Sequence, residues 1–200
     1  MGSPRGVLPF EGAYHTPATL PEIEMITRGH ARTMAAYNRW MNERLYELCA
    51  GLSDAQRKRD RAAFFKSVHG TLNHLLYGDR AWMSRFTGRD LGWKGPADEL
   101  YADFAELRAA RTALDRLIED WTERLEERWL ASDFTYASRI DGRSRTFPAW
   151  ILVTHMFNHQ THHRGQLTTL LSQLGIDPGV TDLPWLPALT SGKGSSSPAP

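Results

Sequence analysis

Four of the eight histidines in this 200-residue chain lie within nine residues, in the segment HMFNHQTHH at 155–163. Histidines four positions apart present their imidazoles on the same side of a helix, the spacing at which two nitrogens from one helix bind one metal ion. At about 100° per residue, the apolar face of this segment includes His163 and has His159 at its edge, while His155 and His162 lie further round. The pair His159 and His163 is therefore the strongest chemical signal.

This pair has the spacing of the zinc-peptidase motif HExxH, but Gln160 stands where that motif has its glutamate. An amide is not a general base, so a peptidase mechanism loses its main support. The common alternative for an isolated pair is a hydrogen-bonded core histidine beside surface histidines. Two nitrogens seldom hold a divalent ion firmly without a third protein ligand, so a third ligand must be sought.

A second amphipathic segment, at 62–86, offers His69 and His74 as the third ligand. His69 borders the apolar face of its helical wheel and His74 projects away from the centre, so geometry favours His69 or leaves the choice open. Asp79 stands in the middle of that face, where a carboxylate needs a partner. It accepts a hydrogen bond from a ligand imidazole or an arginine, coordinates the ion, or forms an internal salt bridge.

The elements that must position these side chains are mostly helical. Apolar residues at three-and-four spacing predict four long helices, at 24–50, 62–86, 97–129 and 149–174. Between the last two, the β-prone runs DFTYASR and RSRTF flank Asp141 and Gly142, a pair typical of tight turns, and predict a small hairpin at 133–147. We therefore predict an all-α four-helix bundle with a β-hairpin before the last long helix.

Shorter segments complete this organisation. Ser53 is typical of an N-cap and predicts a short turn, and Pro184 and Pro187 argue against an ordinary helix in LPWLP, which we expect to pack as a loop over the bundle. Residues 1–22, rich in proline and glycine, are expected to be mobile, 23–188 to form the single bundle domain, and 189–200 to form a disordered tail.

Composition excludes several function classes. Hydrophobic residues make up 41% of the chain, enough for one core, and the net charge of +1 gives no broad field for nucleic acid. Cys49 is the single cysteine, which excludes an intrachain disulfide and a cysteine-based metal site. The sequence has neither the ~18 to 20 apolar residues of a membrane span nor the start of a secretory signal. We expect a cytoplasmic protein with no nucleic-acid or membrane partner.

Three blocks carry a resemblance to a known family: YNRWMNERL at 37–45, SVHGTLNHLLYGDRAWMSRF at 67–86 and HMFNHQTHHRGQLTTLLSQLG at 155–175. Together they resemble the DinB/YfiT-like superfamily, in order from about Thr27 to Gly175, and the HHRGQ core of the last block is the most specific part. The resemblance implies a four-helix bundle, often a homodimer, whose metal site takes one histidine from the second helix and two from the last long helix.

Carried onto this chain, the resemblance implies that the ligand of the second helix is His74, in TLNHLL, against the helical wheel's preference for His69. The other two ligands are His159 and His163. Neutral imidazoles suit a late first-row divalent ion. With the metals found in this family, the resemblance implies one ion per chain, zinc or nickel.

The resemblance also implies that Asp79 supports the ligands and that Asn38, Trp40 and Arg164 contribute to the pocket, with ordinary bundle packing as the alternative. Family activities imply a metal-dependent hydrolase or a thiol S-transferase acting on a small molecule or a low-molecular-weight thiol. The alternative is a non-catalytic, metal-stabilised binding module of a stress response. Cys49, without a catalytic partner in the sequence, is expected to be a small packed hydrophobe rather than a nucleophile.

Overall fold

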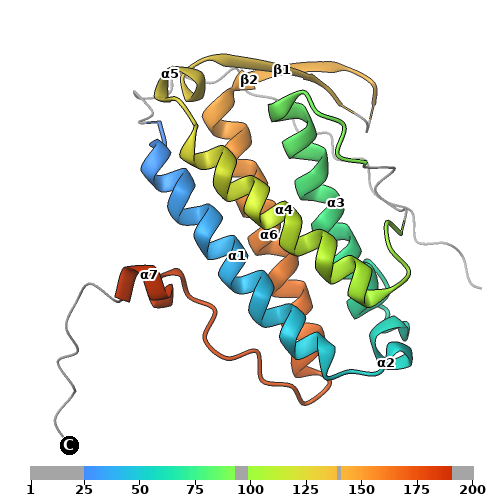
Figure 1. The fold of residues 1–200 in the computed structure, drawn as a ribbon. Coiled ribbons are helices and arrows are strands. Elements are labelled where there is room, and N and C mark those ends of the chain that lie inside the picture. The colour runs from blue at the N-terminus through green and yellow to red at the C-terminus, as the bar shows by residue number, and fades with distance from the viewer. Residues whose placement is uncertain (1–24, 93–98, 139–140, 191–200) are drawn as a thin grey trace, which may run out of the picture.

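The computed structural model describes residues 25–92, 99–138 and 141–190. Its framework is a bundle of four long helices lying side by side (Figure 1). The first of them packs against the third and fourth, and the second packs against the same two. The predicted all-α fold is confirmed, and its long helices are α1 (Arg28–Ala50), α3 (Val68–Thr87), α4 (Phe104–Glu123) and α6 (Ala149–Ser172).

Three of these helices begin later than the apolar periodicity predicts, because each starts at a capping side chain. Thr27 accepts a hydrogen bond from the His30 amide, Ser67 from Gly70 and Asp103 from Glu106. Each cap satisfies an amide that has no partner inside its helix. The predicted starts at 24, 62 and 97 extended the helices into the preceding segments, of which residues 24 and 97–98 lie outside the described residues.

Two further corrections concern helix ends. Residues 62–67 are not helical, since Ala62 and Lys66 have positive φ angles of 54° and 65°. The predicted helix 97–129 is interrupted after Glu123, and a separate short helix, α5 (Glu127–Leu130), follows. The short turn after Ser53 is a helix, α2 (Asp54–Lys58), whose first turn Ser53 and Gln56 close with reciprocal hydrogen bonds.

The predicted hairpin is present. Strands β1 (Asp133–Ala137) and β2 (Ser144–Pro148) pair antiparallel, and Gly142 in the turn has a φ of 70° that suits glycine. Figure 1 shows the hairpin lying across one end of the bundle, next to α5. It leads directly into α6, whose start at Ala149 agrees with the prediction.

The segment from Ile176 to Thr190, here called the strap, runs back along α1 (Figure 1). The Tyr37 hydroxyl donates to the Thr181 carbonyl at 2.5 Å, and the Arg44 guanidinium donates to the carbonyl of Pro178 at 3.2 Å and to that of Val180. The strap contains a 3-10 turn, η1 (Leu183–Trp185), and a short helix, α7 (Pro187–Thr190). The expectation of no helix in LPWLP is thus wrong at Pro187, because proline suits a first helical position.

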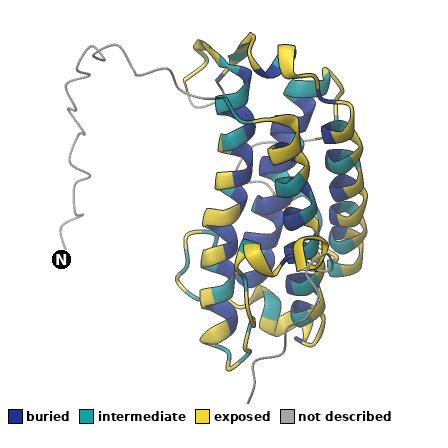
Figure 2. Ribbon diagram, turned by 90° about the vertical axis from the view of Figure 1, so that its left-hand side faces the viewer, coloured by how far each residue is buried: buried dark blue, intermediate teal, exposed yellow. Residues whose placement is uncertain are grey.

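The core lies between the four long helices, whose inward faces are buried while their outward faces are exposed (Figure 2). Its fully buried side chains are mainly leucine and methionine from all four helices, including Met41, Leu72, Leu107 and Met156. Cys49 is also buried there. Within the three described ranges, no helix is long and apolar enough to cross a membrane.

Candidate metal centre

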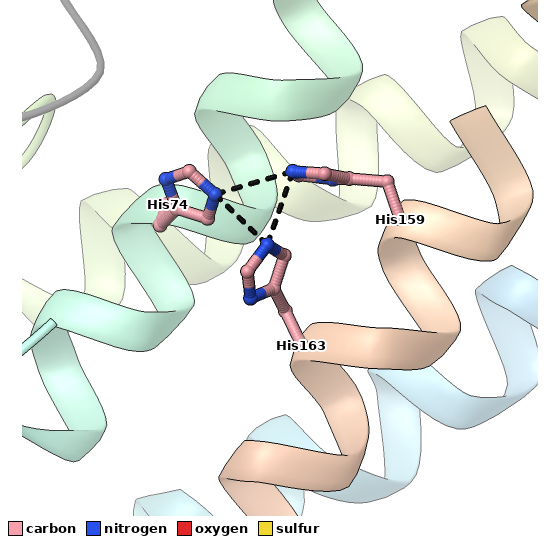
Figure 3. A group of neighbouring side chains, drawn as sticks. All are labelled: His74, His159 and His163. Carbon is pink, nitrogen blue, oxygen red and sulfur yellow. Dashed lines mark hydrogen bonds between the residues drawn. The ribbon is translucent and has the colours of Figure 1, made fainter. Parts of the chain in front are cut away.

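Three histidines meet where α3 packs against α6. His74 comes from α3, His159 and His163 come from α6, and Figure 3 shows their rings pointing toward one another. Their Nε2 atoms are 3.2 Å apart from His74 to each of the others, and 3.1 Å apart between His159 and His163. The structure thus brings together the three histidines that the family resemblance implies.

This triangle of nitrogens suits a cation better than hydrogen bonding among the imidazoles. A neutral imidazole nitrogen carries either a proton or a lone pair, so three of them cannot pair a donor with an acceptor along every edge. Tetrahedral bonds of 2.0 to 2.1 Å to zinc would separate the nitrogens by about 3.3 Å. The observed separations of 3.1 and 3.2 Å are close to that value.

The histidine that the helical wheel favours lies elsewhere. His69 is buried, its Nε2 is 2.8 Å from the carbonyl oxygen of Tyr101, and Glu99 Oε1 is 3.1 Å away. His155 packs on the Trp82 ring, with centroids 5.1 Å apart, and His162 is exposed and contacts Gln166. These histidines occupy other environments than the three-histidine group.

A glycine allows His159 to lie against α3. A Cβ at Gly78 would be 2.6 Å from His159 Cε1 and 2.9 Å from its Nδ1, closer than side chains approach. Gly78 is in the middle of α3, where glycine costs helix stability relative to alanine. The glycine therefore has a steric role in bringing the imidazole close to the α3 backbone, a role that the sequence analysis did not identify.

Two other side chains missed by the sequence analysis orient the remaining histidines. Gln166 Oε1 lies 2.8 Å from His163 Nδ1, and a proton donated there leaves the Nε2 lone pair directed at the other two histidines. The Phe65 ring stacks on His74 with centroids 3.7 Å apart and planes at 17°. The spacing of Gln166 from His163, three residues along one helix, could have indicated the first contact.

The electrostatic surroundings keep the α6 imidazoles neutral. Burial, helped by repulsion from His163 and His74, lowers the pKa of His159 to about 3. Burial also lowers the pKa of His163, although the hydrogen bond to Gln166 acts in the opposite direction. Neutral imidazole is the form that binds a metal ion, so both residues are ready to act as ligands near neutral pH.

Asp79 is part of a buried polar network. Its carboxylate accepts hydrogen bonds from Arg111 Nη1 at 2.8 Å, Gln160 Nε2 at 2.6 Å and Asn38 Nδ2 at 3.4 Å. Arg111 also pairs with Asp115 at 2.8 Å. Of the readings of Asp79, the structure shows a hydrogen bond from an arginine and the internal salt bridge together, both made by Arg111. This pairing satisfies the buried charge as burial demands.

Gln160 and Arg164, each one residue after an α6 histidine of the group, connect α6 to this network. Gln160 Nε2 donates to the Leu75 carbonyl at 2.9 Å as well as to Asp79, and Arg164 donates to Asn38 Oδ1. These bonds fix the rotation of α6 about its axis and so the direction in which its two histidines point.

Trp40 occupies a different place from Asn38 and Arg164. Its ring is partly exposed on α1, 6.0 Å from the Tyr37 ring and 4.9 Å from the Arg44 guanidinium. Trp40 therefore packs beside the strap, whereas Asn38 and Arg164 lie in the buried network.

Comparisons with known proteins agree with this architecture. The family model described as "DinB family" matches residues 25–195. Protein DinB of Bacillus subtilis is 26% identical over 155 residues, which cover 73% of this chain and 87% of the relative. The uncharacterized protein YrdA of the same organism is 26% identical over 136 residues, 67% of this chain and 77% of the relative. The helical bundle and the match over most of its length show that the chain belongs to the DinB family.

Proposed function

We propose that His74, His159 and His163 bind one divalent ion per chain, zinc or nickel, and leave one coordination position for water or a ligand. The observation that carries this proposal is the mutual separation of 3.1 to 3.2 Å among the three Nε2 atoms. Catalytic zinc sites commonly combine three protein ligands with one exchangeable position. When bound, such an ion would lower the pKa of a water molecule or hold a thiol as thiolate.

We propose further that the protein is a metal-dependent enzyme acting on a small molecule, by hydrolysis or by transfer to a low-molecular-weight thiol. The protein's own part would be to hold the ligands rigid, through Gly78 and Gln166, and to keep water from one side of His74 with the Phe65 ring. Cys49 has no place in this chemistry, since burial raises the pKa of its thiol to about 12.

One observation favours a second candidate, a metal-stabilised binding module of a stress response without catalytic activity. Gln160 stands where a zinc peptidase has its general base, and its amide nitrogen donates to the Leu75 carbonyl and to Asp79. It therefore serves packing, not proton transfer.

For either candidate we propose a homodimer, by resemblance to the family, and a cytoplasmic location, which suits a single reduced thiol.

Elemental analysis of protein purified without a metal-affinity tag tests the metal site. We expect about one zinc or nickel ion per chain. His163→Ala should abolish binding, while His162→Ala, which changes an exposed neighbour, should retain it. Full metal content in His163→Ala would contradict the assignment.

The two candidate functions differ in the coordination sphere of the ion. With cobalt(II) in place of the native ion, an open position predicts that added azide changes the visible absorption spectrum. A spectrum that azide leaves unchanged would support the non-catalytic module.

A further inference from the structure

The loop between α2 and α3, residues 59–67, is a tightly built structure beside the three histidines. The Arg61 amide donates to the Lys66 carbonyl at 2.7 Å, and the Lys66 amide donates to the Ala63 carbonyl at 2.8 Å. Ala62 and Lys66 both have left-handed backbone angles, with φ of 54° and 65°. Such angles cost free energy in residues other than glycine, persist where the surroundings enforce them, and often occur near functional sites.

A glycine in α3 permits the close seating of this loop. A Cβ at Gly70 would lie 2.2 Å from the carbonyl oxygen of Phe65, so only glycine leaves room for that carbonyl. The loop is thereby held against the first turn of α3. It presents its two phenylalanines, Phe64 and Phe65, in fixed positions.

The two phenylalanines continue a series of ring contacts that starts at the proposed metal ligands. Phe65 stacks on His74 and meets the edge of His163, with centroids 5.2 Å apart. Phe64 meets Phe65 edge to face at 4.8 Å, yet it is 84% exposed. A single exposed apolar side chain is ordinary. Phe64, however, is held by a strained loop, and only the Phe65 ring lies between it and the proposed ligand His74.

Phe64 and Phe65 separate two pockets of different chemistry. The larger, of about 530 Å³, reaches His74 and is lined by four charged side chains, those of Lys58, Asp60, Lys66 and Glu99. The smaller, of about 280 Å³, lies between the loop and α6. Arg61 is the one charged side chain among its described lining residues, which include Ala63, Leu170 and Thr169. An uncharged apolar group would therefore dehydrate fewer charged side chains in the smaller pocket than in the larger one.

Two side chains that line the smaller pocket also contact the histidines. Gln166 lines it and contacts His163 Nδ1 at 2.8 Å, and Phe65, which lines it too, stacks on His74. A ligand in this pocket would therefore touch two side chains that themselves contact the proposed metal ligands. Its volume suits one ring and its substituents rather than a whole drug-sized molecule.

We propose that the smaller pocket receives a flat, uncharged apolar group of a metal-bound ligand, with Phe64 as the specificity-determining residue. This proposal rests on the proposed metal site, because the ion anchors the other end of the ligand. The aromatic group stacks against the exposed ring of Phe64 and packs beside Ala63 and Leu170.

Two hydroxamates that differ by one ring test the proposal on cobalt(II)-loaded protein. Acetohydroxamate probes the metal alone, and benzohydroxamate adds a phenyl group. Aromatic contacts of this kind correspond to about a tenfold preference, so we expect benzohydroxamate to bind about tenfold more tightly. In Phe64→Ala we expect the preference to fall to about threefold or less, with the affinity for acetohydroxamate unchanged. The cobalt absorption spectrum reports both titrations.

Phe147→Ala is the matched control. Phe147 is 41% exposed on β2, in the hairpin across the end of the bundle, and the variant should keep the full preference for benzohydroxamate. Because Phe64 is mostly exposed, its replacement leaves the core intact. If the cobalt spectrum forms and acetohydroxamate binds, but the preference for benzohydroxamate is absent or is equal in Phe64→Ala, the pocket assignment is wrong while the metal site stands. If the cobalt spectrum forms but neither hydroxamate binds, the open coordination position and the ligand proposal are both wrong. If no cobalt spectrum forms, the metal site and the ligand proposal are both wrong.

Discussion

Replacing Gly78 with alanine should separate metal affinity from fold stability. The new Cβ would lie 2.6 Å from His159 Cε1, whereas ordinary contact begins at 3.4 Å, so the ring must retreat by about 0.8 Å. Metal–ligand distances in working sites vary by only about 0.2 Å. The displaced imidazole cannot keep its nitrogen near the ion unless α3 and α6 move apart. Loss of a supporting contact of this kind lowers metal affinity by about 10- to 100-fold.

The same substitution should not weaken the metal-free protein. Alanine favours a helix interior over glycine by about 1 kcal/mol, and without an ion the His159 ring is free to turn away. We therefore expect the free energy of unfolding of the metal-free protein to stay within about 1 kcal/mol of wild type, or to rise. Urea denaturation measures this quantity, and competition with a chelating dye measures zinc affinity.

Gly165→Ala is the control for helix propensity, since nothing lies within 4 Å of a Cβ at that exposed position of α6. It should stabilise the protein and leave zinc affinity unchanged. A zinc affinity of Gly78→Ala within about twofold of wild type would refute the steric argument, because a 0.8 Å displacement should cost more than that.

Three other measurements test the surroundings of the site. Gln160→Leu removes a donor to Asp79 and should lower the free energy of unfolding by about 1 to 3 kcal/mol in urea denaturation, unlike Gln173→Leu on the exposed side. The His159 pKa falls from 6.5 to about 3 on folding, so its contribution to stability is present above pH 6.5 and is lost as pH falls. Urea denaturation at pH 7 and at pH 5 measures this loss, and the free energy of unfolding should decrease less between the two pH values in His159→Gln than in the wild type. Burial raises the Cys49 pKa from 9.0 to about 12, so the free energy of unfolding should fall as pH rises above 9. The same burial means that a thiol reagent should modify native Cys49 only as fast as the protein unfolds, and the absorbance of the released chromophore measures this rate.

Local sequence patterns predicted the structure correctly where a few neighbouring residues determine it. The hairpin around Gly142 and the start of α6 at Ala149 follow from turn and periodicity signals within a few residues. The late starts of α3 and α4 were also present in the sequence, as the capping residues Ser67 and Asp103, but the apolar residues before them suggested longer helices.

The third histidine shows where periodicity fails. A helical wheel finds the face that is most buried on average, and His69 indeed lies on it, bound to the Tyr101 carbonyl. The three-histidine group lies instead at the flank where α3 meets α6, so His74 projects away from the centre of its own apolar face. Only the family motif pointed to it. The contribution of Gly78 depends on a contact between helices, which the pattern of one helix does not contain.

The strap and the α1 side chains that hold it differ in how freely their sequences can change during evolution. Tyr37 and Arg44 hold it through the main-chain carbonyls of Pro178, Val180 and Thr181, and every amino acid supplies such a carbonyl. Substitutions in the strap can therefore accumulate without loss of these bonds, except at Gly179, where a Cβ would lie 2.5 Å from Arg44 Nη2. Among relatives that keep this path, we expect sequence drift at Pro178, Val180 and Thr181 and constraint on the two α1 side chains that hold them.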